Sequence, residues 1–303
     1  MSTVALRRSL HFVPGGNERM LAKALASNAD ALILDLEDAL AIDRKDSGRA
    51  EVARWLQDAD FGGKQRIVRV NPRTTPWGEA DLEAIVPLAP DALLIPKVNH
   101  LDELTDLDQR IEALSGSAPQ ENAIELVLVA TETPQGALNI ATFPSCARVG
   151  GLTWGAEDLS AALGGTRNRD ESGQYLDTYR YCRVQTLLSA VAGNVQPIDG
   201  VYTDFRDGEG LARECSEARW MGFTGKITIH PNQIDIVNEA FTPTAEEISD
   251  AEALLAAKAD AEAAGQGAFA FRGEMIDAPH ISRAEKLLAR AAACGAATTG
   301  THQ

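Results

Sequence analysis

The sequence contains few of the residues that mark disulfide-rich, zinc-thiolate or nucleic-acid-binding proteins. Only four cysteines occur among 303 residues, and none forms a C-x-x-C pair, so neither a zinc-thiolate site nor a disulfide framework is indicated. Lys and Arg total 28 against 44 Asp and Glu, which gives a formal charge of −16. Such a surface repels phosphate backbones, so no nucleic-acid partner is expected. Any anionic ligand must therefore be met by a local group of cations.

Long hydrophobic runs are also missing. No apolar run approaches the ~18 residues that a membrane span needs, and the first residues lack the apolar segment of a signal peptide. The hydrophobic content of 45% and the charged content of 24% are ordinary for a soluble globular protein. We therefore expect a soluble, cytoplasmic protein with no membrane partner.

Short apolar runs recur along the chain, each followed by an amphipathic stretch with helical spacing. There are eight such runs: Leu10–Pro14, Ala31–Leu36, Arg66–Val70, Ala92–Pro96, Ile124–Thr131, Arg148–Trp154, Pro197–Tyr202 and Lys226–His230. They are continuous rather than alternating, as expected for parallel strands that are buried on both faces. Eight strand–helix units in about 240 residues predict an α/β fold, a (β/α)8 TIM barrel.

A doubly wound open sheet is the rival architecture. It usually carries a Gly-rich nucleotide turn after its first strand. The nearest candidate, Gly265–Ala270, follows an Ala-rich helix instead of a strand, which favours the barrel.

Composition changes at residue 242, where the chain becomes rich in Ala and acidic residues. We expect a catalytic barrel domain over residues 1–241 and a C-terminal helical extension over residues 242–303. The extension should contain a helix to about residue 264, a loop over Gly265–Gly273, a second helix over Ser282–Ala293, and a frayed tail. Because roughly 60 residues are too few for an independent core, the extension should pack on the barrel or on a neighbouring subunit.

Charged side chains gather at the predicted carboxyl ends of the strands, where barrel active sites form. In strand order they are Asp35, Glu37 and Asp38; Arg69; Lys97; Glu132; Glu157 and Asp158; and Asp204. Oxygen ligands without His or Cys suit Mg²⁺ better than Zn²⁺. A single acid at a strand end is more often a helix cap, and Arg69 could be a structural partner of Glu132 or Asp35. The clustering of acids and bases by barrel position favours a functional site.

The chain resembles the citrate lyase β-subunit-like family of CoA-thioester lyases in the HpcH/HpaI aldolase superfamily, which includes malyl-CoA and citramalyl-CoA lyases. The similarity covers nearly the whole chain in family order. It rests on nine stretches: Arg8–Gly15, Lys23–Ser27, Leu34–Ala39, Val68–Asn71, Pro96–Val98, Glu132–Gly136, Gly155–Leu159, Gly225–Pro231 and Met275–Pro279.

The resemblance implies roles for individual residues. Glu132 and Asp158 would bind Mg²⁺ directly, with Asp35, Glu37 and Asp38 around its waters, and Arg69 would face the thioester oxygen. The residues implied in coenzyme A binding are Arg8, Asn17, Arg19, Lys23 and Lys97. Asp277 would be a catalytic acid that a lid delivers across a subunit interface, which implies a homo-oligomer, a trimer; from the residues alone, Asp277 is a loop or helix-cap acid.

The implied activity is Mg²⁺-dependent cleavage of a citramalyl-, malyl- or citryl-CoA type thioester into a 2-oxoacid and acetyl-CoA by retro-Claisen chemistry. Two alternatives share the same build: a malyl-CoA-type thioesterase, and a citrate lyase β subunit that acts on an acyl-carrier-protein thioester. An aldolase for free 2-oxoacids and a non-catalytic acidic scaffold are further alternatives.

Overall fold

The computed structural model describes residues 7–116, 123–263 and 268–295. The chain forms two compact units, and the boundary between them in the sequence lies between Asn238 and Glu239.

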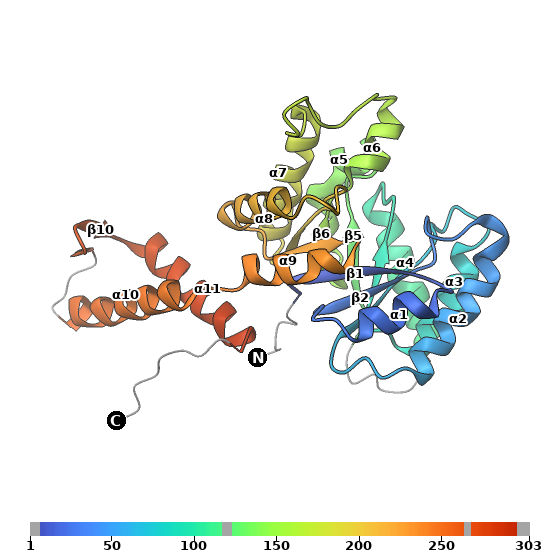
Figure 1. Cartoon of the computed structure of the whole chain (residues 1–303), viewed down its shortest axis with the longest axis horizontal. Coiled ribbons are helices and arrows are strands. Elements are labelled where there is room, and N and C mark those ends of the chain that lie inside the picture. Colours follow the sequence, from blue (N-terminus) through green and yellow to red (C-terminus); the bar gives the residue numbers. More distant parts are fainter. Residues whose placement is uncertain (1–6, 117–122, 264–267, 296–303) are drawn as a thin grey trace. The chain divides into compact units, whose positions relative to one another are not determined.

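The first unit is a closed barrel of eight parallel strands in sequence order (Figure 1). The strands are β1 (Ser9–Pro14), β2 (Ala31–Asp35), β3 (Gln65–Arg69), β4 (Ala92–Ile95), β5 (Glu125–Val129), β6 (Val149–Thr153), β7 (Gln196–Asp199) and β8 (Gly225–Thr228). Pairing of β1 with β8, with Leu10 opposite Ile227, closes the sheet. The predicted (β/α)8 barrel is therefore confirmed, and the open-sheet alternative is wrong.

Helices surround the barrel. In the first unit they are α1 (Glu18–Leu25), η1 (Ile42–Arg44), α2 (Lys45–Asp58), α3 (Gly78–Ile85), η2 (Val86–Leu88), α4 (Leu101–Ser115), α5 (Pro134–Asn139), η3 (Ile140–Ser145), α6 (Ala156–Leu163), α7 (Asp177–Ala192), α8 (Gly208–Met221) and η4 (Pro231–Gln233), with α9 (Ile234–Phe241) crossing into the second unit. Among the described residues, none of the helices is long and apolar enough to cross a membrane.

Side chains alternate between two hydrophobic layers along each strand. Ile33 and Ile67 belong to the inner core of the barrel, whereas Leu34 and Val68 pack in the outer core between sheet and helices. Because successive side chains in a strand point to opposite faces, Asp35 and Arg69 share the inward side with Ile33 and Ile67. The last residues of β2 and β3 thus present opposite charges at the mouth of the barrel.

The second unit contains two long helices and a hairpin. They are α10 (Ala245–Ala263), β9 (Phe269–Phe271), β10 (Glu274–Ile276) and α11 (Ala278–Ala293). The loop expected over Gly265–Gly273 is therefore wrong for its described part, which forms one strand and the turn of the hairpin. Residues 264–267 and the predicted frayed tail beyond Gly295 lie outside the described residues. The last helix begins four residues before the predicted Ser282.

Candidate active site at the barrel mouth

Asp35 and Arg69 form the rigid base of the mouth. The Arg69 guanidinium donates from Nε and Nη2 to the two Asp35 oxygens, each at 2.7 Å. Asp35 also accepts from the backbone N–H groups of Glu37 and Ala39, so it fixes the turn after β2. The prediction that Arg69 has a structural acidic partner is confirmed for Asp35. The carboxylate of Asp35 is engaged on both oxygens, which makes it a positioning residue for Arg69.

Glu37 and Lys97 are the second charged pair. Glu37 is buried; its Oε1 accepts from Lys97 Nζ at 2.6 Å, and its Oε2 lies 3.0 Å from Arg69 Nη1 without a well-aligned hydrogen bond. Lys97 has a left-handed backbone, φ 56°, which is rare for a residue with a side chain and marks local strain. Its ammonium group also lies 3.2 Å from Asp158 and 3.7 Å from Asp38. The ammonium of Lys97 thus lies among three carboxylates, and its predicted contact with coenzyme A stays a prediction.

Glu132 is a buried acid that lies just beyond the carboxyl end of β5. It follows β5, is 4% exposed, and accepts the Lys97 backbone N–H on Oε2 at 2.8 Å. Gly155 lets it lie there, because a Cβ at that position would be 2.8 Å from Glu132 Cγ. The glycine before α6 therefore allows the segments after β5 and β6 to approach closely.

The mouth carries more negative than positive charge. Three carboxylates, Glu37, Asp158 and Asp38, share the single ammonium of Lys97. Burial, together with the charges of Glu37 and Asp158, raises the pKa of Glu132 to about 8. Burial also raises the pKa of Glu37, against the opposing effect of Arg69. Buried carboxyl groups with raised pKa values are typical of functional sites, and the excess of negative charge makes the mouth a candidate site for a cation.

These residues fit a divalent cation with a sparse protein shell. Glu132 and Asp158 come from adjacent strand ends, and both lie near Lys97. Mg²⁺ is commonly bound by one or two carboxylates while waters complete its octahedron. No group of three Asp, Glu, His or Cys side chains suited to a metal occurs in the described part of the chain. The donor set therefore fits Mg²⁺ held by two carboxylates, and it does not fit an all-protein cage.

Lys45 supports the mouth and was missed by the sequence analysis. It begins α2, is buried, and donates to the backbone oxygens of Leu36 and Glu37 and to Asn71 Oδ1 at 2.7–3.0 Å. Asn71 in turn donates to the oxygen of Leu36. These bonds fix the turn that carries Glu37. No local sequence pattern predicts this role of Lys45, because most of its hydrogen-bond partners are backbone atoms that only folding brings close.

The predicted coenzyme A residues separate into two groups. Asn17 caps α1 by accepting from the Met20 N–H, as predicted, and Arg19 and Lys23 are exposed one turn apart on that helix. Because α1 follows the carboxyl end of β1, its N-terminus lies at the mouth end. Arg8 precedes β1 and pairs with Asp30 at 2.8 Å, at the opposite end of the strands. Arg8 therefore has a structural partner at the barrel floor, and its predicted role toward coenzyme A stays a prediction.

Asp277 occupies the N-cap position of α11 in the second unit, as its sequence context indicated. Its carboxylate lies 2.6 Å from Nδ1 of His280, and the two form a reciprocal capping arrangement. The Asp277 side chain is 57% exposed. The carboxylate is thus oriented and accessible within its own unit.

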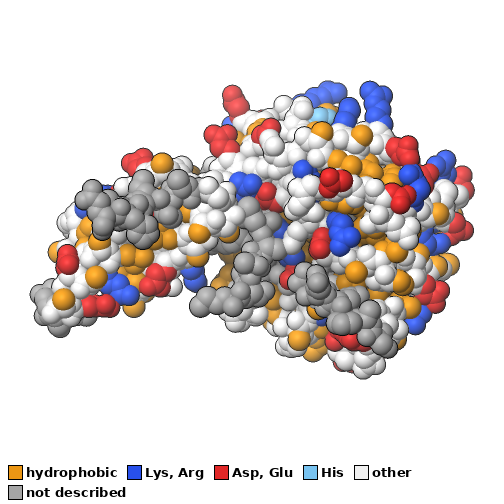
Figure 2. Space-filling model, turned by 90° about the horizontal axis from the view of Figure 1, so that it is seen from below, with side chains coloured by type: hydrophobic (Ala, Val, Ile, Leu, Met, Phe, Trp, Pro, Cys, Tyr) orange, Lys and Arg blue, Asp and Glu red, His pale blue; other side chains and the backbone are white. Residues whose placement is uncertain are grey.

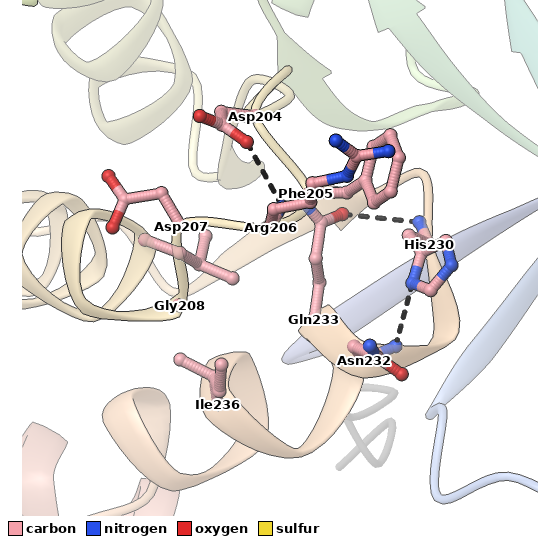
Figure 3. A pocket seen from close by; sticks show the side chains of 10 residues that line it. Asp204, Phe205, Arg206, Asp207, Gly208, His230, Asn232, Gln233 and Ile236 are labelled. Carbon is pink, nitrogen blue, oxygen red and sulfur yellow. Dashed lines mark hydrogen bonds between the residues drawn. The ribbon is translucent and has the colours of Figure 1, made fainter.

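A separate cavity of about 520 Å³ lies beside the segments that follow β7 and β8 (Figure 3). The rings of Phe205 and His230 stack with centroids 4.9 Å apart. The His230 side chain accepts from the Asn232 N–H, and Gln233 accepts from the His230 N–H. This network caps the start of η4, so His230 is a capping residue. The cavity is lined by Asp204, one of the predicted strand-end acids, and by none of Glu37, Asp38, Glu132 and Asp158.

A second buried charged cluster lies outside the sheet, beneath α7 and α8. Lys226 Nζ is 2.7 Å from Asp199 Oδ2 and 2.9 Å from Glu214 Oε1, and Arg183 makes two bonds of 3.0–3.1 Å to Asp199. The Trp154 N–H donates to Asp199 as well. Burial alone would raise the pKa of Asp199, but Lys226 and Arg183 hold that pKa well below its usual range.

Comparisons with known proteins agree with this architecture. The family model HpcH/HpaI aldolase/citrate lyase matches residues 8–231. A (3S)-malyl-CoA thioesterase of Cereibacter sphaeroides is 41% identical over 95% of this chain and 96% of its own length. The mitochondrial citramalyl-CoA lyase of Mus musculus is 36% identical, covering 93% of this chain and 85% of the mouse protein.

Solved structures show the same similarity. The CitE protein of Mycobacterium tuberculosis, in complex with magnesium, acetoacetate and coenzyme A, superimposes with a TM-score of 0.79 at 34% identity, covering 95% of this chain and 99% of that one. The family match spans the whole barrel, including every charged residue of the mouth. The chain therefore belongs to the HpcH/HpaI aldolase/citrate lyase family of carbon–carbon lyases.

Proposed function

We propose that this protein is a Mg²⁺-dependent lyase that cleaves a short 3-hydroxyacyl-CoA of the citramalyl-, malyl- or citryl-CoA type into a 2-oxoacid and acetyl-CoA. One observation carries the proposal: the barrel mouth combines an excess of buried carboxylates with a fixed guanidinium. The relatives named above include a citramalyl-CoA lyase, and a related structure holds magnesium with coenzyme A.

Glu132 and Asp158 would hold the ion, with Glu37 and Asp38 beside them. When bound, Mg²⁺ would supply electrostatic stabilisation for the negative charge that develops on the hydroxyl and carboxylate oxygens of the substrate. The ammonium group of Lys97 neutralises part of the acidic cluster. It contacts both Glu37 and Asp158. The site therefore needs little rearrangement to receive the ion.

Arg69 would stabilise the enolate formed when the C2–C3 bond breaks. Three of its five donors face Asp35 and Glu37, so the guanidinium is held in place while two N–H groups are left to meet the thioester oxygen. Donors of this kind, fixed before the reaction, typically lower a barrier by about 3–4 kcal/mol.

Asp277 is the proposed acid that protonates the enolate carbon. Its exposed carboxylate at the start of α11 could be brought to the mouth by a lid from a neighbouring subunit of a homotrimer, with Asn17, Arg19 and Lys23 meeting the coenzyme A portion. Asp277→Asn should keep binding of the CoA ester and lose turnover by about 10²–10⁴. Binding calorimetry beside steady-state rates tests this; retention of most activity would remove Asp277 from the mechanism.

A thioesterase acting on malyl-CoA is the second candidate. The 41% identity to a (3S)-malyl-CoA thioesterase exceeds the 36% identity to a citramalyl-CoA lyase, and the same acidic mouth could orient a water molecule towards the thioester. The two activities differ in their products: a lyase releases a 2-oxoacid, whereas a thioesterase releases free coenzyme A and a hydroxyacid.

The test is a product assay with citramalyl-, malyl- and citryl-CoA, each with Mg²⁺ and with EDTA. We expect one of the thioesters to give its 2-oxoacid (pyruvate, glyoxylate or oxaloacetate) in Mg²⁺ alone, with acetyl-CoA in equal amount. Free thiol without any 2-oxoacid would replace the lyase with the thioesterase. Cleavage of none of the three, despite a bound metal, would contradict both.

A further inference from the structure

The acid proposed to protonate the enolate has a histidine as its partner. Asp277 is the N-cap residue of α11 and His280 is the third residue of that helix; Nδ1 of the His280 ring lies 2.6 Å from Asp277 Oδ1. Ile276 on one side of the pair and Ile281 on the other are only 3% and 9% exposed. These two buried residues anchor the turn, which holds the carboxyl and the imidazole side by side.

The His280 side chain contacts the acid more closely than it contacts the backbone. In an ordinary capping box, the third helical residue is Glu or Gln, and its side chain accepts from the N–H of the N-cap residue. Here the Asp277 backbone nitrogen is 3.4 Å from His280 Nδ1, longer than a usual hydrogen bond, whereas the carboxyl oxygen is at 2.6 Å. Capping of the helix accounts for the longer contact and leaves the shorter one unexplained.

The short contact contains a proton, because two bare lone pairs at this distance would repel each other. With the proton on Nδ1, the ring donates to the carboxylate; with the proton on Oδ1, the carboxylic acid donates to Nδ1. Both states are compatible with the same positions of the nitrogen and the oxygen. The pair therefore transfers a proton between ring and carboxyl without rearrangement.

An acid that protonates an enolate in every cycle needs a supply of protons. Carboxyl groups in water are almost fully ionised near neutral pH, whereas imidazole is the side chain that exchanges its proton in that range. An exposed carboxylate without a partner would rarely hold the proton that the enolate carbon takes up. A neighbouring imidazole removes this difficulty.

We propose that His280 is a positioning residue that orients Asp277 and supplies its proton, a role that rests on the function proposed above. When the C2–C3 bond breaks, the substrate hydroxyl loses its proton to water, and the O–H bond of Asp277 breaks as the new C–H bond of acetyl-CoA forms. The Nδ1 proton of His280 then moves to Asp277, and water returns a proton to the ring, which is 36% exposed. One proton is released and one is taken up, so no co-reactant is needed.

The other charges of the second unit include several ion pairs that do not involve His280. They join Lys258 of α10 to Glu262 and Glu285, and Arg272 of the hairpin turn to Asp250. Figure 2 shows acidic and basic side chains interspersed on the face of this unit that is in view. Arg283 follows His280 by three residues, which places it on the same side of α11. Arg283 is therefore a suitable control position.

Two substitutions separate capping from proton supply. His280→Gln keeps a usual capping residue at this position but cannot act as an acid, and His280→Ala leaves room for added imidazole. Both should turn over the cleaved CoA thioester about 10–100-fold more slowly, with KM within about twofold of the wild type. Added imidazole should restore part of the rate of His280→Ala and leave the wild-type rate unchanged. Arg283→Gln, the matched control, should keep the wild-type rate.

The contact can also be measured without substrate. In protein labelled with ¹⁵N-histidine, the ring signals of His280 are identified by their absence in His280→Gln. They should shift in Asp277→Asn, because an amide cannot share a proton with Nδ1 as a carboxyl group does. The ring signals should stay in place in Arg283→Gln.

Three results would each overturn the proposal: wild-type turnover in the two His280 variants, a slow His280→Ala that imidazole does not rescue, or unchanged ring signals in Asp277→Asn. With a slow Asp277→Asn, any of these results removes the role of His280 and leaves the proposed acid standing. Wild-type turnover in Asp277→Asn would instead remove the acid, and the role of His280 with it. Should His280→Ala fold poorly by circular dichroism, His280→Gln and the ring signals decide.

Discussion

Two buried clusters of charge in the same barrel unit are built in opposite ways. Outside the sheet, Asp199 is surrounded by Lys226, Arg183 and the indole of Trp154, and its pKa is lowered. At the mouth, Glu132 is buried beside other carboxylates, and its pKa is raised to about 8. One cluster is balanced by its own cations, whereas the other has an excess of negative charge.

The difference separates a structural role from a functional one. Ionised groups are costly to bury unless they are paired, and Asp199 is paired on both oxygens. Glu132 and its neighbours share too few cations, so burial and the neighbouring carboxylates together raise the pKa of Glu132. Buried carboxyl groups with too few neighbouring cations, and hence with raised pKa values, cluster at functional sites. The comparison therefore supports a structural role for the first cluster and the ion-binding role proposed above for the second.

Removal of Glu132 should give the largest effect and should affect activity alone. Glu132→Gln keeps the shape of the side chain and resembles its protonated form, so the melting temperature without metal should change little. Cleavage should fall by about 10³ or more, since a proposed ligand of the ion is lost. Rates over a range of Mg²⁺ concentrations, beside thermal unfolding, check both parts. Full activity at high Mg²⁺ would remove Glu132 from the proposed metal site.

Removal of Lys226 should instead lower the stability of the fold. Lys226→Met removes the fully buried ammonium that pairs with both Asp199 and Glu214 and leaves only Arg183 on Asp199 and Arg169 on Glu214; the loss of one member of a buried pair typically costs about 3–5 kcal/mol. The free energy of unfolding in urea measures this. The double variant Lys226→Met, Asp199→Asn should recover part of the loss. Unchanged stability of the single variant would contradict a structural role for the cluster.

Arg69→Lys tests whether the cation at the mouth acts by its position. Lysine keeps the charge but cannot make the two parallel bonds to Asp35. Turnover should fall by about 10²–10³, while calorimetric binding of Mg²⁺ changes less. If turnover falls only in proportion to stability, Arg69 is a structural residue.

The pH dependence of stability should differ in sign between the clusters. The folded pKa of Glu132, about 8, lies above its ordinary value of 4.5, so its contribution is fully present below about pH 4.5 and is lost as pH rises through 8. For Asp199 the folded pKa lies below 3.8, so its contribution is present above that pH and is lost in acid.

Urea unfolding of metal-free protein between pH 5 and 8 should therefore show stability that decreases with pH. Glu132→Gln should flatten that slope, whereas Lys226→Met should lower stability at every pH in the range. An equal slope in the wild type and Glu132→Gln would place the titration elsewhere.

The barrel could be predicted because its strands are short apolar runs that end in charged residues. The same logic placed Asp35, Arg69, Lys97 and Glu132 at the mouth. Arg8, by contrast, was connected with coenzyme A only by the family resemblance; in the structure it precedes β1 and pairs with Asp30 at the opposite end of the barrel.

Other features left no signal in the sequence. Lys45 binds backbone oxygens that only folding brings together. Lys226 is a cation within a strand, and its partners Asp199 and Glu214 come from β7 and α8. The β9–β10 hairpin has strands of only three residues with few buried side chains, so no alternation of polarity marked it. Contacts made in three dimensions, and not along the chain, account for these misses.

Calorimetric titration of the metal-free protein with Mg²⁺ tests the central claim most directly. The account predicts about one ion bound per chain by the wild type, with binding lost in Glu132→Gln and in Asp158→Asn but retained in Lys226→Met at a temperature where that variant is folded. Equal Mg²⁺ binding by the wild type and both mouth variants would show that the excess of carboxylates at the barrel mouth does not serve a metal ion.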